Sequence, residues 1–158
     1  MNFLTEHGIS SYGELESKLT ALSARRDTAH AEIKRIESRS AELALVMKHA
    51  GTYRQLKPLY DRYRKSNDKE KFLRGHESEI ILFEAAAREL KRLGAVPLPT
   101  TESMKTELAN LNAEKERLLA EYKAARTEAQ EYDTVKQNVD ALLTVPKEQE
   151  QQRRHELE

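Results

Sequence analysis

The feature that most constrains this chain is an apolar stripe that alternates steps of three and four residues and occurs twice. Because a helix repeats every ~3.6 residues, such a stripe keeps one narrow face apolar and favours two helices that wind around each other. The first copy comprises Tyr12, Leu15, Leu19, Leu22, Arg26, Ala29, Ile33, Ile36, Ser40, Leu43, Met47 and Ala50. The second copy comprises Met104, Leu108, Leu111, Lys115, Leu118, Tyr122, Ala125, Ala129, Tyr132, Lys136, Val139 and Leu142.

The composition agrees with long helices that are surrounded by water. Charged residues make up 34% of the chain and hydrophobic residues 38%, with only 5 glycines and 4 prolines. This balance is atypical of a compact α/β enzyme. Lys and Arg number 27, as do Asp and Glu, so the chain as a whole has no net attraction to nucleic acid or membrane.

Several protein classes are disfavoured by what the sequence lacks. It has no cysteine, which excludes disulfides and thiolate metal sites. It has no run of about 18 apolar residues that would span a bilayer, and its start does not resemble a signal peptide. We therefore expect a soluble, cytoplasmic protein with no membrane contact.

Capping and helix-breaking residues predict the segment boundaries. We expect a short helix within residues 1–10 and a helical hairpin domain over 11–143. Ser11, followed three residues later by Glu14, has the spacing of a capping box. It should begin a long helix at about 11–50, because Gly51 and Pro58 disturb the pattern beyond that point.

The remaining boundaries follow from the same signals. A small helical cap is expected at about 52–96, with a short helix near 69–74 and a better one at 76–93, which Gly94 ends. A second long helix, capped by Thr100 or Thr101, should span about 101–143. Val145-Pro146 should stop this helix, and the residues after them lack an apolar period, so the tail at 144–158 is expected to be disordered.

The predicted fold is all-α: an elongated antiparallel coiled-coil hairpin of two long helices with the helical cap between them. Pairing within one chain is favoured, and pairing between chains in a homodimer is the alternative. The charged stripe residues Arg26, Lys115 and Lys136 should lay their stems along the seam and reach water. The matching stripes predict the pairs Tyr12 with Val139, Leu19 with Tyr132, Leu22 with Ala129, Ala29 with Tyr122, Ile33 with Leu118, Leu43 with Leu108 and Met47 with Met104.

No motif predicts catalysis or a bound cofactor. The sequence contains no phosphate-binding loop, no dinucleotide fingerprint and no nucleophile elbow. No two of the five histidines have the spacing of a helical metal-ligand pair. We therefore expect no enzyme activity, no cofactor, no metal and no small-molecule substrate. The histidines are His7, His30, His49, His76 and His155.

A local excess of positive charge is the one candidate binding feature. The segment from residue 54 to residue 74 contains eight cationic residues and only three acidic ones, Asp61, Asp68 and Glu70. Aromatic residues are interleaved with the cations. Cations bind phosphates and aromatic rings stack on bases, although the aromatic residues are equally expected as a small core. The candidate nucleic-acid-binding residues are Arg54, Lys57, Arg62, Arg64, Lys65, Lys69, Lys71 and Arg74.

The order of several short segments resembles the helical C-terminal region of relaxases, the mobilisation nucleases of Gram-positive integrative conjugative elements. The nuclease that this resemblance implies uses a tyrosine and a histidine-bound metal, and neither arrangement occurs here. The similar segments are Asn-Phe-Leu-Thr-Glu-His-Gly-Ile at 2–9, Ser-Tyr-Gly-Glu-Leu at 11–15, Tyr-Asp-Arg-Tyr-Arg-Lys-Ser at 60–66, Lys-Phe-Leu at 71–73, His-Glu-Ser-Glu-Ile at 76–80, Leu-Pro-Thr at 98–100 and Lys-Gln-Asn-Val-Asp-Ala-Leu-Leu at 136–143.

The resemblance implies a non-catalytic accessory module in element or plasmid mobilisation. Its expected partners are DNA, proteins of the conjugation machinery or a second copy of the chain. Two other functions remain open from the sequence. One is a generic coiled-coil adaptor or dimerisation module unrelated to DNA, and the other is a nucleic-acid-binding helical arm, as found on some aminoacyl-tRNA synthetases.

Overall fold

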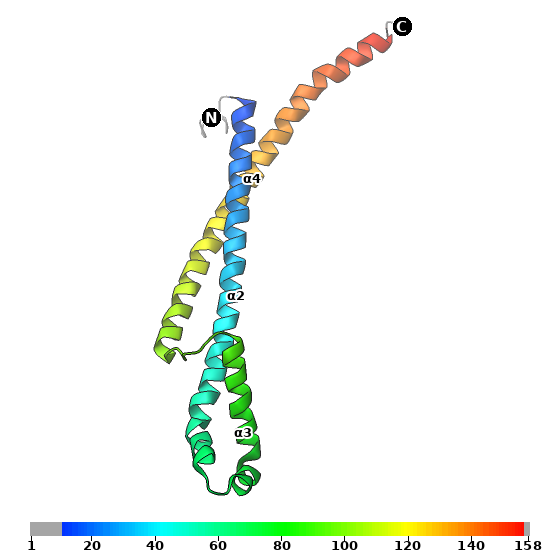
Figure 1. The fold of residues 1–158 in the computed structure, drawn as a ribbon. Coiled ribbons are helices and arrows are strands. Elements are labelled where there is room, and N and C mark those ends of the chain that lie inside the picture. The colour runs from blue at the N-terminus through cyan, green and yellow to red at the C-terminus, as the bar shows by residue number, and fades with distance from the viewer. Residues whose placement is uncertain (1–10, 157–158) are drawn as a thin grey trace. The chain divides into compact units, whose positions relative to one another are not determined.

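A computed structural model describes the backbone of residues 11–156 and the side chains of residues 11–143. Three helices make up this part of the chain, and it contains no strand (Figure 1). They are α2 (Tyr12–Lys65), α3 (Lys69–Arg92) and α4 (Thr101–Glu156). The all-α prediction is therefore confirmed. The short helix predicted within 1–10 lies outside the described residues.

Helix α2 begins where the sequence predicts but ends later. The Ser11 hydroxyl oxygen accepts a hydrogen bond from the Glu14 backbone N–H at 3.2 Å, which caps the first turn. The predicted end near residue 50 is wrong, because the helix passes through Gly51 and Pro58 to Lys65. Residues 52–65 of the predicted cap thus belong to α2.

Tertiary packing explains why Pro58 does not end α2. A proline inside a helix removes only one backbone donor, although its ring also crowds the preceding turn. Tyr53 and Tyr60, on either side of Pro58, both stack on Phe83 of α3, with ring centroids 4.8 and 4.3 Å away. This packing stabilises the helical turns before and after the proline.

Helix α3 contains the break that the sequence predicted near Gly75. Asp68 caps its first turn by accepting a hydrogen bond from the Lys71 N–H at 3.1 Å. The backbone leaves helical geometry at His76, where φ is −139° and ψ is 26°. The two predicted pieces are therefore present, joined across a kink.

The end of α3 follows the predicted glycine signal. Gly94 has a φ of 71°, in the left-handed region that glycine adopts without strain. Its N–H donates to the Lys91 carbonyl at 3.1 Å, and the Ala95 N–H donates to the Leu90 carbonyl at 2.9 Å. This pair of bonds is the Schellman arrangement, which satisfies carbonyls at the helix end.

Helix α4 begins at the predicted cap and also ends later than predicted. The Thr100 hydroxyl oxygen accepts a hydrogen bond from the Ser103 N–H at 3.1 Å. The helix then continues through Pro146 to Glu156, so the prediction of a disordered tail from residue 144 is wrong over 144–156. Lys, Glu, Gln and Arg dominate this stretch, and their high helix propensity favours helix on the C-terminal side of Pro146.

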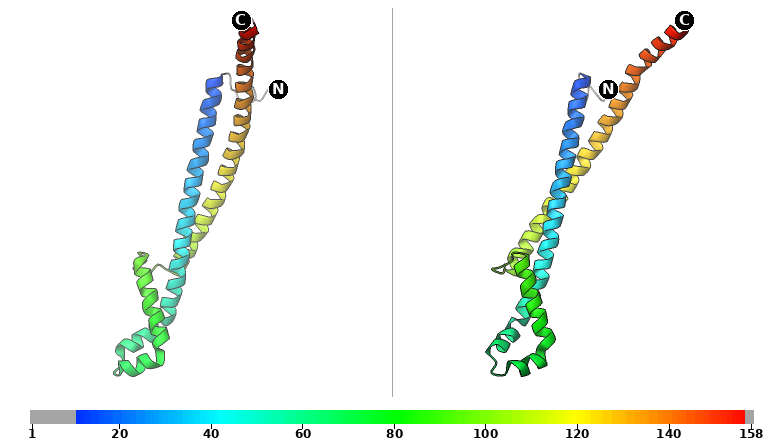
Figure 2. Two further views of the ribbon diagram at one scale, coloured as in Figure 1. Left: turned by 90° about the vertical axis from the view of Figure 1, so that its right-hand side faces the viewer. Right: turned by 45° about the vertical axis from the view of Figure 1, so that its right-hand side comes forward.

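The described residues form two compact units. The first combines the part of α2 up to Ile33 with the part of α4 from Glu116 onwards, and the second is Lys34–Lys115. In the first unit the early part of α2 runs beside the later part of α4 (Figure 2). Leu15, Leu22, Ala129 and Tyr132 form a buried cluster there, with Leu19 and Val135 packed against it.

The contacts in the first unit show that α2 and α4 are antiparallel there, because residues further along α2 meet residues earlier in α4. The Tyr12 hydroxyl donates to Asp140 Oδ1 at 2.6 Å, and Asp140 directly follows the predicted partner Val139. The rings of His30 and Tyr122 lie 5.9 Å apart. The buried cluster contains both members of the predicted pair Leu22 with Ala129, and Leu19 packs against the cluster that holds its predicted partner Tyr132.

The second unit packs the later part of α2 against α3 and the start of α4. Arg39 holds Glu107 with two hydrogen bonds of 2.7 and 3.2 Å. Phe83 and Leu90 of α3 are buried. Figures 1 and 2 both show α3 beside the end of α2, with the turn at residues 66–68 joining them.

Burial follows the predicted stripes closely. Two apolar stripe residues are exceptions: Leu142 is 72% exposed and Tyr12 is 36% exposed. The other apolar stripe residues are buried or half-buried. The three charged stripe residues are half-buried and reach carboxylates: Arg26 meets Asp27 at 3.2 Å, Lys115 meets Glu37 at 3.2 Å and Lys136 meets Glu16 at 4.0 Å. The buried stripe members are Leu15, Leu22, Ala29, Ile33, Ile36, Leu43, Ala50, Met104, Leu111, Leu118, Ala125, Ala129 and Tyr132.

Candidate nucleic-acid interface

The basic segment, defined as residues 54–74, spans the last turns of α2, the connecting turn and the beginning of α3 (Figure 1). All eight of its cationic side chains are exposed. The segment lies entirely within the second unit. The structure nevertheless separates the eight cations by what their side chains contact.

Two of the cations have structural partners. Arg54 donates to the Thr101 hydroxyl at 2.8 Å and to the Pro99 carbonyl, which ties α2 to the start of α4. Lys57 forms an ion pair with Asp61 one turn further along, at 3.1 Å. These contacts use hydrogen-bonding capacity that a phosphate would otherwise take.

Two further cations contact other residues of the basic segment while remaining exposed. The Arg62 guanidinium lies over the Phe72 ring, 5.8 Å from its centroid. Arg74 donates a hydrogen bond of 3.4 Å to the Glu70 carbonyl. These contacts orient the side chains without neutralising their charge.

The remaining four cations flank the turn at 66–68. Two end α2 and two begin α3, and none forms an ion pair with a side chain that the structure describes. Their charges are therefore available to an anionic partner at the end of the α2–α3 pair. We call these residues the turn cations: Arg64, Lys65, Lys69 and Lys71.

The interleaved aromatic residues form a row between α2 and α3. Tyr60 connects to Tyr63 at 5.9 Å, Tyr63 to Phe72 at 6.0 Å and Phe72 to His76 at 4.7 Å between ring centroids. Phe83, which is 6% exposed, anchors this row. The rings therefore pack against one another, although Tyr60, Tyr63 and Phe72 are only half-buried.

A groove of about 570 Å³ opens beside this row, and the sequence alone did not indicate it. Glu84, Ala87 and Arg88 of α3 line it although none was a candidate. The only available signal was that Phe83 and Ala87 share the apolar face of α3. We call it the aromatic groove, and it is lined by Tyr53, Lys57, Tyr60, Asp61, Arg64, Phe83, Glu84, Ala87 and Arg88.

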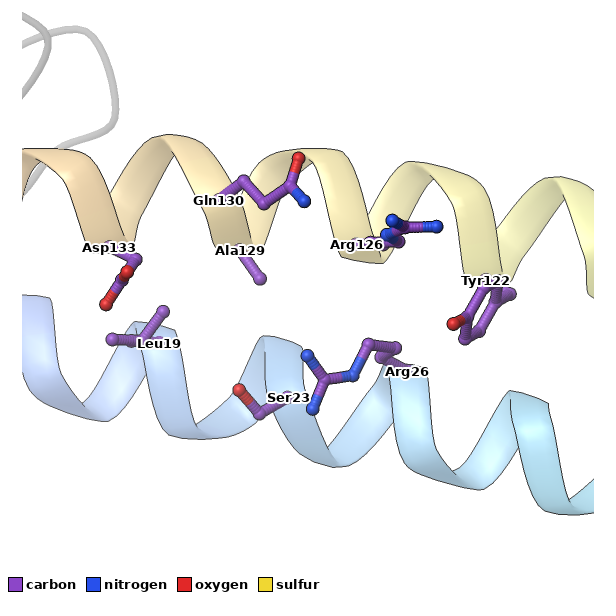
Figure 3. A pocket seen from close by; sticks show the side chains of 8 residues that line it. All are labelled: Leu19, Ser23, Arg26, Tyr122, Arg126, Ala129, Gln130 and Asp133. Carbon is purple, nitrogen blue, oxygen red and sulfur yellow. The ribbon is translucent and has the colours of Figure 1, made fainter.

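A second groove, of about 340 Å³, lies between α2 and α4 in the first unit (Figure 3). Leu19 and Arg26 of α2 point towards α4, and Tyr122 and Ala129 of α4 point towards α2. The small side chain of Ala129 leaves the space open. Arg26 is paired with Asp27, and Asp133 lines the groove together with Arg126, so the charges of this lining are close to balanced, unlike those of the turn cations.

The described part of the chain offers no metal centre and no membrane-spanning helix. Among the described side chains, no three His, Asp or Glu residues gather as a metal site. No helix within the described residues combines the length and the apolar character needed to cross a bilayer. Comparisons with family models, with curated proteins and with solved structures found no match for this chain.

Proposed function

We propose that this chain is a non-catalytic helical module of the kind found after the nuclease of a conjugative relaxase, and that it contacts DNA in the cytoplasm during element mobilisation. The observation that carries the proposal is the group of turn cations, which are exposed and without ion pairs among the described side chains. Proteins of the conjugation machinery are the other partners of such a module. The family assignment itself rests on the sequence resemblance described above.

The proposed contact is made to phosphates and is independent of sequence. Lys and Arg displace the counterions of a nucleic acid, and this release makes affinity fall steeply with salt. Four phosphate contacts on a single strand correspond to a slope of about −3 in a plot of log affinity against log salt. Phosphate contacts by themselves read no base sequence.

We further infer that α2 and α4 pair along their length as an antiparallel coiled-coil hairpin within one chain. Two ion pairs of the second unit support this inference, Lys115 with Glu37 and Arg35 with Glu114. The hydrogen bond from Tyr12 to Asp140 supports it in the first unit. A dimerisation module is the alternative, favoured by Leu142 and Leu143, which are 72% and 59% exposed.

The proposal is tested by fluorescence anisotropy with labelled DNA, at about 50 and about 200 mM salt. The unaltered chain should bind weakly at the lower concentration and lose most of its affinity at the higher one. Changing all four turn cations to Glu should abolish binding, because phosphates would then face four carboxylates. Circular dichroism should show unchanged helix content, since the four side chains are exposed.

A matched control changes the charge by the same amount elsewhere. Its four sites are exposed cations outside the basic segment, also changed to Glu, and this variant should keep most of the affinity. No binding by the unaltered chain at low salt, or an equal loss in both variants, would disprove the proposed contact. Metal-dependent nicking of transfer-origin DNA would disprove the non-catalytic assignment. The control sites are Lys18, Arg25, Lys105 and Lys123.

A further inference from the structure

The aromatic groove combines exposed π surface with nearby positive charge. Tyr53 and Tyr60 are half-buried and line the groove, and both stack on Phe83 at an interplanar angle of 25°. Stacking on Phe83 occupies one face of each tyrosine ring. The groove therefore has an aromatic wall that solvent reaches, which a purely internal core would not provide.

The charges around the groove favour an anionic ligand. Lys57 and Asp61 neutralise each other in an ion pair of 3.1 Å. Arg64 and Arg88 line the groove without an ion pair among the described side chains, and Glu84 is the remaining carboxylate. Arg64 is also a turn cation, so the groove and the proposed phosphate-binding surface share a residue.

We propose that the aromatic groove binds an unpaired base of single-stranded DNA, while the turn cations hold the adjoining phosphates. This inference rests on the proposed function and specifies its ligand. Bases in a duplex already stack on one another, whereas a single strand exposes base faces that stack on aromatic side chains. The groove volume of about 570 Å³ lies within the range of small-ligand sites.

The experiment compares three labelled probes in the anisotropy assay at low salt: a thymidine oligonucleotide, an abasic oligonucleotide of the same length, and a duplex. The thymidine strand should bind about tenfold more tightly than the abasic strand, which carries the same phosphates but no bases. The chain has 6 tyrosines and no tryptophan. Tyrosine fluorescence should therefore be quenched by the thymidine strand and not by the abasic strand.

Ala87→Leu tests the site without removing an aromatic ring. Ala87 lines the groove, so a leucine there fills the space while Tyr53, Tyr60 and Phe83 keep their mutual stacking. The variant should bind the thymidine and abasic strands equally. The matched control is Ala44→Leu, an exposed position on α2 away from the groove, which should keep the tenfold preference.

A second variant, Tyr60→Leu, provides an independent test in case Ala87→Leu does not fold. It should also remove the preference for the thymidine strand over the abasic strand, and cooperative thermal unfolding shows that each variant is folded. Equal binding of thymidine and abasic strands by the unaltered chain would overturn the groove assignment. In that case the turn-cation variant would still lose binding, and the proposed function would stand. Absence of binding to every probe would overturn both.

Discussion

Tyr12 illustrates how a single polar contact fixes a residue at the edge of the helix pair. Its hydroxyl donates to Asp140, and this hydrogen bond, with lesser contributions from desolvation and the nearby carboxylate charges, raises the pKa of Tyr12 from 10.0 to about 12. The protonated phenol is therefore favoured in the folded chain. The resulting stability is complete below pH 10 and is lost as the pH rises towards about 12.

Replacing Tyr12 by Phe should remove this pH dependence. Between pH 10 and about 12 the unaltered chain should lose more unfolding free energy than Tyr12→Phe, because its unfolded state ionises at Tyr12 first. Urea denaturation of both proteins at neutral and alkaline pH measures the difference. Identical pH profiles would show that the contact with Asp140 does not persist in solution.

The basic segment shows that residue type alone does not decide which cationic side chains are engaged by partners. Its eight cations look equivalent in the sequence. In the structure Arg54 and Lys57 are engaged by Thr101 and Asp61, whereas Arg64 and Lys65 have no ion pair among the described side chains. A partner 47 residues away along the chain decides the role of Arg54, and local spacing cannot reveal it.

At the scale of the element, the apolar stripe identifies which face of each long helix is buried. Ile33 of α2 is a stripe residue and is 6% exposed. Changing it to Ala removes apolar contacts and leaves a cavity, so Ile33→Ala should lower the free energy of unfolding by about 2–4 kcal/mol. Chemical denaturation measures the loss.

Leu45→Ala is the matched control for that change. Leu45 belongs to the same helix but is 42% exposed, so its truncation should cost distinctly less than that of Ile33. If both variants are equally stable, the stripe face is not buried in solution.

Element ends were predicted well at the caps and at Gly94, and poorly where Gly51 or a proline was taken as a stop. Ser11, Thr100 and Gly94 all lie at helix ends, because each satisfies backbone groups that the helix leaves unpaired. Pro58 and Pro146 lie inside helices instead. A proline costs one hydrogen bond and some crowding of the preceding turn, and at Pro58 the stacking of Tyr53 and Tyr60 on Phe83 opposes that cost.

At the scale of the whole molecule, the proposed hairpin has a measurable consequence. A compact chain of this length would have a radius of gyration of ~15 Å. Small-angle scattering of an antiparallel hairpin should give a clearly larger value that is independent of protein concentration. A radius near the compact value would contradict the hairpin, and a radius and mass that grow with concentration would favour the dimer.

Residue patterns alone predict the all-α class, the buried helix faces and the capped helix ends. These depend on local spacing, because a helix brings residues three and four apart onto one face whatever surrounds it. Packing between distant segments, by contrast, determines that α2 continues past Pro58, which cations are engaged, and that Tyr53, Tyr60 and Ala87 line one groove. Those features depend on contacts between residues far apart in the chain, whose free energies outweigh local preference.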